Sequence, residues 1–153
     1  MDSYEAGVNY LARSQRTVEE LKRYLLKKKF SDEEISKTVN ELLKLGYLDD
    51  NKYIKNYLEY ALCKYYGAYK IYQELKKKGI REYDYEDALM QYEEDIGCSL
   101  SDICNKKANE FAEKFMLGKE TDEKQIAKLG RRLKSLGHSS DVIYSIIGIY
   151  IRR

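Results

Sequence analysis

The residue types that most often perform catalysis occur together once in this sequence, in the run His138-Ser139-Ser140-Asp141. A histidine, a hydroxyl and a carboxylate are the groups of a hydrolase triad, in which the base activates the nucleophile and the acid orients the base. Adjacent residues at the start of one helix cannot form that chain of hydrogen bonds. A serine that caps the helix and an aspartate in its first turn explain the same run. We therefore expect no catalytic residue and no enzymatic activity.

The other chemical motifs are incomplete. Asp49 and Asp50 would give Mg²⁺ two ligands, but no repeat-related position supplies further oxygens, and helix capping accounts for at least one of the pair. Cys98 and Cys104 lack both the spacing of a zinc site and a nearby histidine. The dipeptide Gly118-Lys119 lacks the upstream glycine of a phosphate-binding loop. The sequence predicts neither a metal site nor a cofactor.

Basic side chains give a stronger signal, because they gather in three segments. Five basic residues lie in each of the segments 18–30, 67–81 and 124–138, beside two, one and no acidic residues respectively. One interpretation is a solvated surface, since cations favour the C-terminal ends of helices. The other is a row of cations that meets a phosphate backbone, shared with an acidic protein partner. The charge pattern alone does not decide between them.

An apolar pattern that occurs three times predicts the elements that position these charges. Its first copy is Leu21, Leu25, Phe30, Ile35, Val39 and Leu42. The second is Ile71, Leu75, Ile80, Tyr85, Leu89 and Tyr92, and the third is Leu129, Leu133, His138, Ile143, Ile147 and Tyr150. Spacings of three and four are those of an apolar helix face, and the break between them indicates a helix-turn-helix corner.

We therefore predict an all-α fold of three tandem three-helix repeats that form an elongated, curved helical array. The expected repeats are residues 1–50, 51–98 and 99–153. Such an array presents an extended surface rather than a deep pocket, which favours a long binding partner over catalysis.

Capping signals predict the helix ends. Thr17 with Glu20, and Ser31 with Glu34, have capping-box spacing. We expect the fourth helix to run to Tyr66, with Gly67 as its break, and the sixth to span about 84–92 or to end a little beyond Tyr92. The other expected helices are near 4–14, 18–28, 32–45, 68–78, from Ser99 or Ser101 to Phe115 or Leu117, from after Thr121 to Gly137, and from Ser139 or Ser140 to the C-terminus.

Composition limits the class of protein. The chain has 153 residues, of which 35% are charged and 43% hydrophobic, so it resembles neither a disordered nor a membrane protein. No run of about 18 apolar residues is present to span a bilayer. The N-terminal segment 1–5 lacks the features of a secretory signal, and the three cysteines show no CxxC spacing. We expect a cytoplasmic monomer without a membrane partner.

Three segments, in their order and spacing, resemble the RecX family. They are residues 10–21, Gly46-Tyr47-Leu48-Asp49-Asp50, and residues 67–80 with their Ile-x-x-Glu-Leu-x-x-Lys-Gly-Ile element. The resemblance covers essentially the whole chain. It implies an all-helical bacterial regulator of the RecA recombinase, active in DNA repair, homologous recombination and the SOS response. Such a protein lies along the groove of the RecA filament on single-stranded DNA and modulates, usually inhibits, ATP hydrolysis and strand exchange.

The family has no catalytic set, so only basic positions carry over from it. Ala68, Lys70 and His138 stand where many members have Pro, Arg and Ile, and Lys70 replaces a planar fork by a point charge. The residues expected to bind RecA or DNA are Arg13, Arg16, Arg23, Lys70, Lys76, Lys77, Lys78, Arg131 and Arg132. Two alternatives remain: a free-standing helical DNA-binding protein that acts without RecA, and a scaffold for an unrelated protein.

Overall fold

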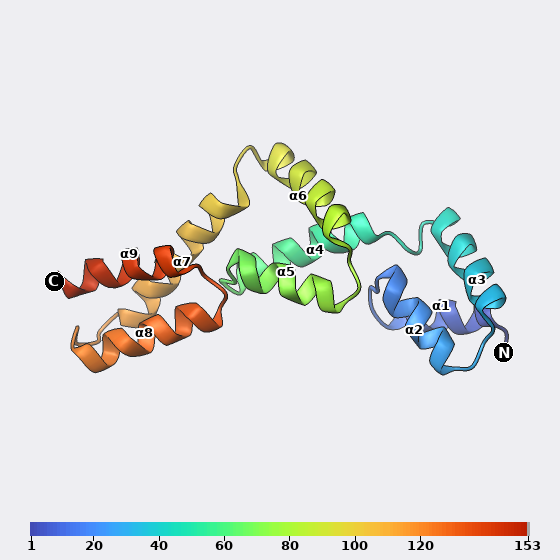
Figure 1. Cartoon of the computed structure of the whole chain (residues 1–153), viewed down its shortest axis with the longest axis horizontal. Helices are drawn as coiled ribbons and strands as arrows, with labels where there is room; N and C mark the ends of the chain where they lie inside the picture. The colour runs from blue at the N-terminus through green and yellow to red at the C-terminus, as the bar shows by residue number, and fades with distance from the viewer. Residues whose placement is uncertain (153) are drawn as a thin grey trace. The chain divides into compact units, whose positions relative to one another are not determined.

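The structure, a computed structural model, describes residues 1–152, and that part of the chain contains nine α-helices and no strand. Short loops join the helices, as Figure 1 shows. This confirms the predicted all-α class and its three groups of three helices. The helices are α1 (Ser3–Arg13), α2 (Val18–Lys27), α3 (Asp32–Lys44), α4 (Asp50–Cys63), α5 (Ala68–Lys77), α6 (Glu82–Ile96), α7 (Leu100–Met116), α8 (Glu123–Ser135) and α9 (Ser140–Ile151).

Both predicted capping boxes are confirmed. The Thr17 hydroxyl accepts from the Glu20 amide at 3.1 Å, and the Glu20 carboxylate accepts from the Thr17 amide at 3.0 Å. Ser31 and Glu34 form the same reciprocal pair, with both distances 3.1 Å. Each cap satisfies amides that the first turn leaves unpaired and is worth about 1 kcal/mol. The caps therefore fix the starts of α2 and α3 where the sequence predicts them.

The predicted end of α4 is wrong. This helix ends at Cys63 rather than Tyr66, and Tyr65, not Gly67, takes the left-handed conformation that closes it, with φ of 65°. The Tyr66 amide then donates back to the Ala61 carbonyl at 3.0 Å, which completes the turn. A tyrosine seldom adopts this conformation, so the sequence points to the nearby glycine instead.

Helix α6 begins two residues before the predicted start near Asp84, and it ends four residues after Tyr92, where the sequence predicts an end at Tyr92 or a little beyond. Its first intrahelical bond runs from the Tyr85 amide to the Arg81 carbonyl at 3.0 Å, so Arg81 occupies the cap position without a capping side chain. The helix continues to Ile96 because Gly97, with φ of 79°, provides its left-handed end.

The chain forms two compact units, residues 1–56 with 75–88, and residues 57–74 with 89–152. In the first unit, α1, α2 and α3 pack around a core that includes Leu21, Leu25, Val39 and Leu42. In the second, α7, α8 and α9 pack around a core that includes Ala108, Leu129, Leu133 and Ile146. Full burial of each leucine stabilises its unit by about 1.5–3 kcal/mol.

Within the first unit, the start of α2 contacts the turn between α5 and α6. Thr17 is fully buried there, and its hydroxyl donates to the Lys78 carbonyl at 2.6 Å. Gly79 lies so close that a Cβ atom on it would be 2.3 Å from the Glu19 Cβ. The carbonyls at the end of a helix have no intrahelical partner, so this contact satisfies one of them.

Within the second unit, the start of α5 makes the equivalent contact with the turn between α8 and α9. The Gly67 amide donates to the Leu136 carbonyl at 2.7 Å. A Cβ on Gly67 would lie 2.3 Å from the Gly137 carbonyl oxygen, and a Cβ on Gly137 would lie 2.4 Å from the Lys70 Cβ. The apolar pattern relates Gly67 to Thr17 and Gly137 to Gly79. One packing solution therefore occurs twice, and it requires a glycine in each turn.

Candidate functional site

The adjacent carboxylates of Asp49 and Asp50 serve two different helices. Asp49 accepts from the Lys52 amide at 3.1 Å and caps α4, which confirms the predicted capping role for this residue. Asp50 accepts from the Val18 amide, the first of α2, at 2.9 Å. Burial raises the pKa of Asp50, and the Val18 hydrogen bond partly opposes this rise. Within residues 1–152, no group of three or more His, Cys, Asp or Glu side chains is placed to hold a metal ion.

The run from His138 to Asp141 is built for structure. Ser139 caps α9 by accepting from the Val142 amide at 3.3 Å, as predicted. The His138 ring is buried, and its Nε2 lies 2.8 Å from the Tyr65 carbonyl oxygen. Burial also raises the pKa of Cys104 to about 11, so this thiol forms little thiolate near neutral pH. These side chains are therefore occupied or inert rather than poised as nucleophile and base.

Burial lowers the pKa of His138 from its usual value of 6.5, and the Tyr65 carbonyl only partly opposes this. The folded protein thus takes up this proton less readily than the unfolded chain, so stability falls as the pH drops from about 6.5 through the lower folded pKa. We expect the variant His138→Gln, which keeps an N–H donor but does not titrate, to lose less stability over this window. Urea unfolding of both proteins at about pH 7 and pH 5 measures the difference. Equal losses in the two proteins would contradict this role for His138.

The nine candidate basic residues differ in whether their side chains already contact other residues of the chain. Arg16, Arg23 and Lys78 belong to the first unit and pair within it. The Arg16 guanidinium lies 4.7 Å from the Tyr10 ring centroid and 3.7 Å from the Glu20 carboxylate. Lys78 pairs with the same carboxylate at 3.6 Å. Both cations therefore have partners at the start of α2, and their role in binding stays a prediction.

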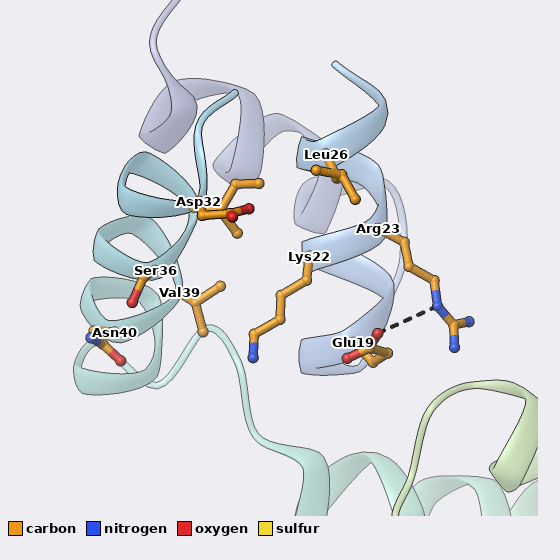
Figure 2. A pocket seen from close by; sticks show the side chains of 9 residues that line it. Glu19, Lys22, Arg23, Leu26, Asp32, Ser36, Val39 and Asn40 are labelled. Atoms are coloured by element: carbon orange, nitrogen blue, oxygen red, sulfur yellow. Dashed lines mark ion pairs between the residues drawn. The ribbon is translucent and has the colours of Figure 1, made fainter. Parts of the chain in front are cut away.

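Arg23 also has a structural role. Its Nε lies 3.6 Å from the Glu19 carboxylate (Figure 2). Its Nη1 donates to the Lys77 carbonyl at 3.1 Å. Lys76 and Lys77, at the end of α5, and Arg13, at the end of α1, have exposed side chains. In the second unit, the Lys70 ammonium lies 4.3 Å above the Tyr66 ring. Six of the nine residues therefore lie in the first unit, and three, Lys70, Arg131 and Arg132, lie in the second.

A hollow on α8 is lined by several cations. The hollow has a volume of about 490 Å³ and is lined by Phe115, Lys119, Gln125, Lys128, Arg131 and Arg132. The Arg132 guanidinium lies 5.5 Å and 5.9 Å from the Phe111 and Phe115 ring centroids, which holds it in place. Among residues 1–152, none of the four cations lies in an ion pair. Four uncompensated cations around one hollow favour an anion such as a phosphate group.

Arg131 and Arg132 are among the binding residues predicted from the sequence, whereas Lys119 and Lys128 are not. Lys128 could have been predicted from the sequence, because it lies three and four residues before the two arginines and therefore on the same side of the helix. Lys119 comes from the loop after α7, and only the tertiary fold brings it to α8.

A second hollow, between α2 and α3 in the first unit, has a mixed lining (Figure 2). Its volume is about 310 Å³, and Lys22 and Arg23 on α2 are offset by Glu19 and Asp32. The buried side chains of Ile35 and Val39 and the exposed side chain of Leu26 supply apolar surface. Balanced charge around an apolar floor suits a polypeptide better than a nucleic-acid strand.

No helix in the described part of the chain combines the length and the apolar character that crossing a bilayer requires.

Comparison with known proteins gives a consistent result. Residues 4–42 match a family model described as "RecX, first three-helix domain". The chain is 31% identical over 143 residues to "Regulatory protein RecX" of Vibrio parahaemolyticus, covering 94% of this chain and 88% of that protein. It is 28% identical to the protein of the same name from Legionella pneumophila, covering 94% and 91% of the two chains.

A solved structure agrees with these matches. The crystal structure of RecX from Lactobacillus salivarius superposes with a TM-score of 0.77 at 27% identity. The match covers 99% of this chain and 96% of that one. Sequence and fold thus point to the same group of proteins.

Proposed function

Because the chain belongs to the RecX family of regulatory proteins, we propose that it binds along the groove of the RecA filament on single-stranded DNA and inhibits ATP hydrolysis and strand exchange. In this proposal the protein is a cytoplasmic monomer that regulates RecA without catalysing a reaction itself. Its repeats, residues 1–50, 51–98 and 99–153, act as successive binding modules. The 31% identity over 94% of the chain is the single observation that carries the proposal.

The distribution of charge supports this function. A filament on single-stranded DNA presents both protein surface and phosphate groups, and the chain offers a matching face for each. The hollow between α2 and α3 has an apolar floor with balanced charge, whereas the hollow on α8 is lined by four cations. Arg13, Lys70, Lys76, Lys77, Arg131 and Arg132 stay the proposed partner residues. Arg23 and Lys78 link the first repeat to the second, whereas Arg16 pairs within the first repeat.

The test is the rate of ATP hydrolysis by RecA on single-stranded DNA, measured while this protein is added. We expect a dose-dependent fall in the rate. An unchanged rate, with RecA active and this protein folded, would contradict the proposal. Binding to bare DNA in that case would favour a DNA-binding protein that acts without RecA.

A further inference from the structure

The hollow on α8 takes its cations from two different elements. Lys119 lies in the loop that follows α7, and the other three cations, Lys128, Arg131 and Arg132, lie on α8. The volume of about 490 Å³ falls within the usual range of about 300–1,000 Å³ for small-molecule pockets. In the part of the chain that the structure describes, no acidic side chain lines the hollow. Cations that come from two elements can contact one small anion from more than one direction.

Two phenylalanine rings support one of these cations. The Arg132 guanidinium lies over both Phe111 and Phe115, and the two rings stack on each other with their centroids 5.7 Å apart. A guanidinium that already rests on rings loses less conformational freedom when it binds a ligand, and its planar fork matches the geometry of a phosphate group. Arg132 is therefore the cation best prepared to hold a phosphate.

The rest of the lining is neutral. The half-buried ring of Phe115 gives the hollow an apolar wall, and the side-chain amide of Gln125 can both donate and accept hydrogen bonds. A pocket of this kind combines apolar surface with a few polar groups that orient the ligand. The hollow therefore has room and partners for a neutral group that is attached to a chain of phosphates.

The other two repeats lack this arrangement. By the repeat spacing, Arg132 corresponds to Tyr24 in the first repeat and to Glu74 in the second. Tyr24 stacks on Tyr10 with the ring centroids 4.0 Å apart, so an aromatic pair occupies the position of the cation there. A glutamate at that position repels a phosphate. The cluster of cations therefore belongs to the third repeat alone, and the packing that the repeats share does not require it.

The convergence of the cations favours a compact polyanion over an extended strand. A nucleic-acid strand has one phosphate per nucleotide, so a groove that binds it follows the backbone over several nucleotides. A triphosphate instead concentrates several negative charges in one small group. A hollow that is lined by charge of one sign concentrates electrostatic potential at one place in the same way.

We propose that the hollow on α8 is a regulatory site for a compact polyphosphate, either the triphosphate of a free nucleotide or a short inorganic polyphosphate. The four cations donate hydrogen bonds to the phosphate oxygens, and the fork of Arg132 pairs with one phosphate. The binding itself requires neither RecA nor DNA. Its regulatory consequence rests on the proposed function: the same cations are proposed to meet the phosphates of the DNA, so an occupied hollow weakens the inhibition of RecA.

The first test is isothermal titration calorimetry of the full chain with inorganic tripolyphosphate, ATP and adenosine, at equal ionic strength and without RecA or DNA. We expect tripolyphosphate and ATP to bind and adenosine not to bind, because the phosphates supply the charge that the site recognises. Equal affinity for tripolyphosphate and ATP would support a site for the phosphate chain alone. Tighter binding of ATP would support a nucleotide site in which Phe115 also contacts the nucleoside.

Two variants and a matched control locate the site. Arg132→Gln and Lys119→Gln change cations from different elements, and each should bind tripolyphosphate about tenfold more weakly, as expected for one lost hydrogen bond to a charged group. The control is Lys124→Gln, which removes an exposed cation of α8 that does not line the hollow. This control should bind within about twofold of the wild type, since exposed charges that do not touch the ligand contribute little. Melting temperatures confirm that the variants are folded.

Three results would overturn the site. They are the absence of binding by both tripolyphosphate and ATP, wild-type affinity in Arg132→Gln, and equal weakening by Lys124→Gln, since binding would then depend on net charge and not on the hollow.

The regulatory step has its own measurement, which is inhibition of RecA ATP hydrolysis by this protein with and without tripolyphosphate at constant free Mg²⁺, relative to RecA alone under each condition. Tripolyphosphate should raise the concentration of wild-type protein needed for half-maximal inhibition, and it should have a smaller effect on Lys119→Gln. An unchanged concentration for the wild type would overturn the regulatory step. Polyphosphate binding in calorimetry, together with no inhibition of RecA under any condition, would contradict the proposed function and leave the polyphosphate site in place.

Discussion

The variant Gly137→Ala is expected to lose roughly 3 kcal/mol of unfolding free energy. Gly137 has φ of 92°, which costs a residue with a Cβ about 1–3 kcal/mol. The new methyl group would lie 2.4 Å from the Lys70 Cβ and 2.6 Å from the Lys70 backbone nitrogen. Since this contact involves backbone, the start of α5 has to move, and overpacking of this kind costs a further 1–3 kcal/mol or so. Urea unfolding measures the loss.

Two matched glycines separate the causes of that loss. Gly97 has φ of 79° but no atom within 4 Å of an added Cβ, so Gly97→Ala reports the conformational cost alone. Gly67 lacks a positive φ, but an added Cβ would lie 2.3 Å from the Gly137 oxygen, so Gly67→Ala reports the steric cost. We expect Gly137→Ala to exceed Gly97→Ala by at least about 1 kcal/mol. Equal losses would show that the contact between α5 and the α8–α9 turn is not tight.

The triple variant Lys128→Gln, Arg131→Gln, Arg132→Gln is expected to require about 100-fold more protein for half-maximal inhibition of RecA ATP hydrolysis. Each phosphate contact on a single strand contributes about 0.7 to the slope of log affinity against log salt. Three lost contacts at about 0.1 M salt then correspond to roughly two orders of magnitude, and the slope itself should fall by about 2.

A control variant that loses the same charge elsewhere tests whether inhibition depends on the position of the cations or on the net charge of the protein. Lys27, Lys37 and Lys44 are exposed lysines of the first unit, outside the α8 face. Their triple glutamine variant should inhibit RecA nearly as well as the wild type. If both triple variants weaken inhibition equally, overall charge rather than the α8 surface is responsible.

The features that the sequence predicts correctly are those with local causes. The capping boxes at Thr17 and Ser31 need only residues three positions apart, so they are visible without the fold. The predicted end of α4 is wrong because Gly67 does not end the helix. A glycine is needed at this position because the chain passes close to Gly137. Tyr65 closes the helix instead, and its carbonyl lies against His138, which is 73 residues away in the chain.

The part of the candidate site that depends on local sequence could also be predicted. The excess of cations in residues 124–138 is a composition signal, and it led directly to Arg131 and Arg132. The structural role of Arg23 could not be predicted from the sequence, because its hydrogen-bond partner is the Lys77 carbonyl of another repeat. Lys119 could not be predicted either, because it lies in the loop after α7 and only the tertiary fold brings it to α8.

The most direct test of the central claim is the rate of single-strand-dependent ATP hydrolysis by RecA, titrated with this protein at low and high salt. The account predicts a dose-dependent fall in the rate, with half-maximal inhibition at higher protein concentration in high salt and at still higher concentration for the α8 triple variant. A rate that stays constant at both salt concentrations, with folded protein and active RecA, would contradict it.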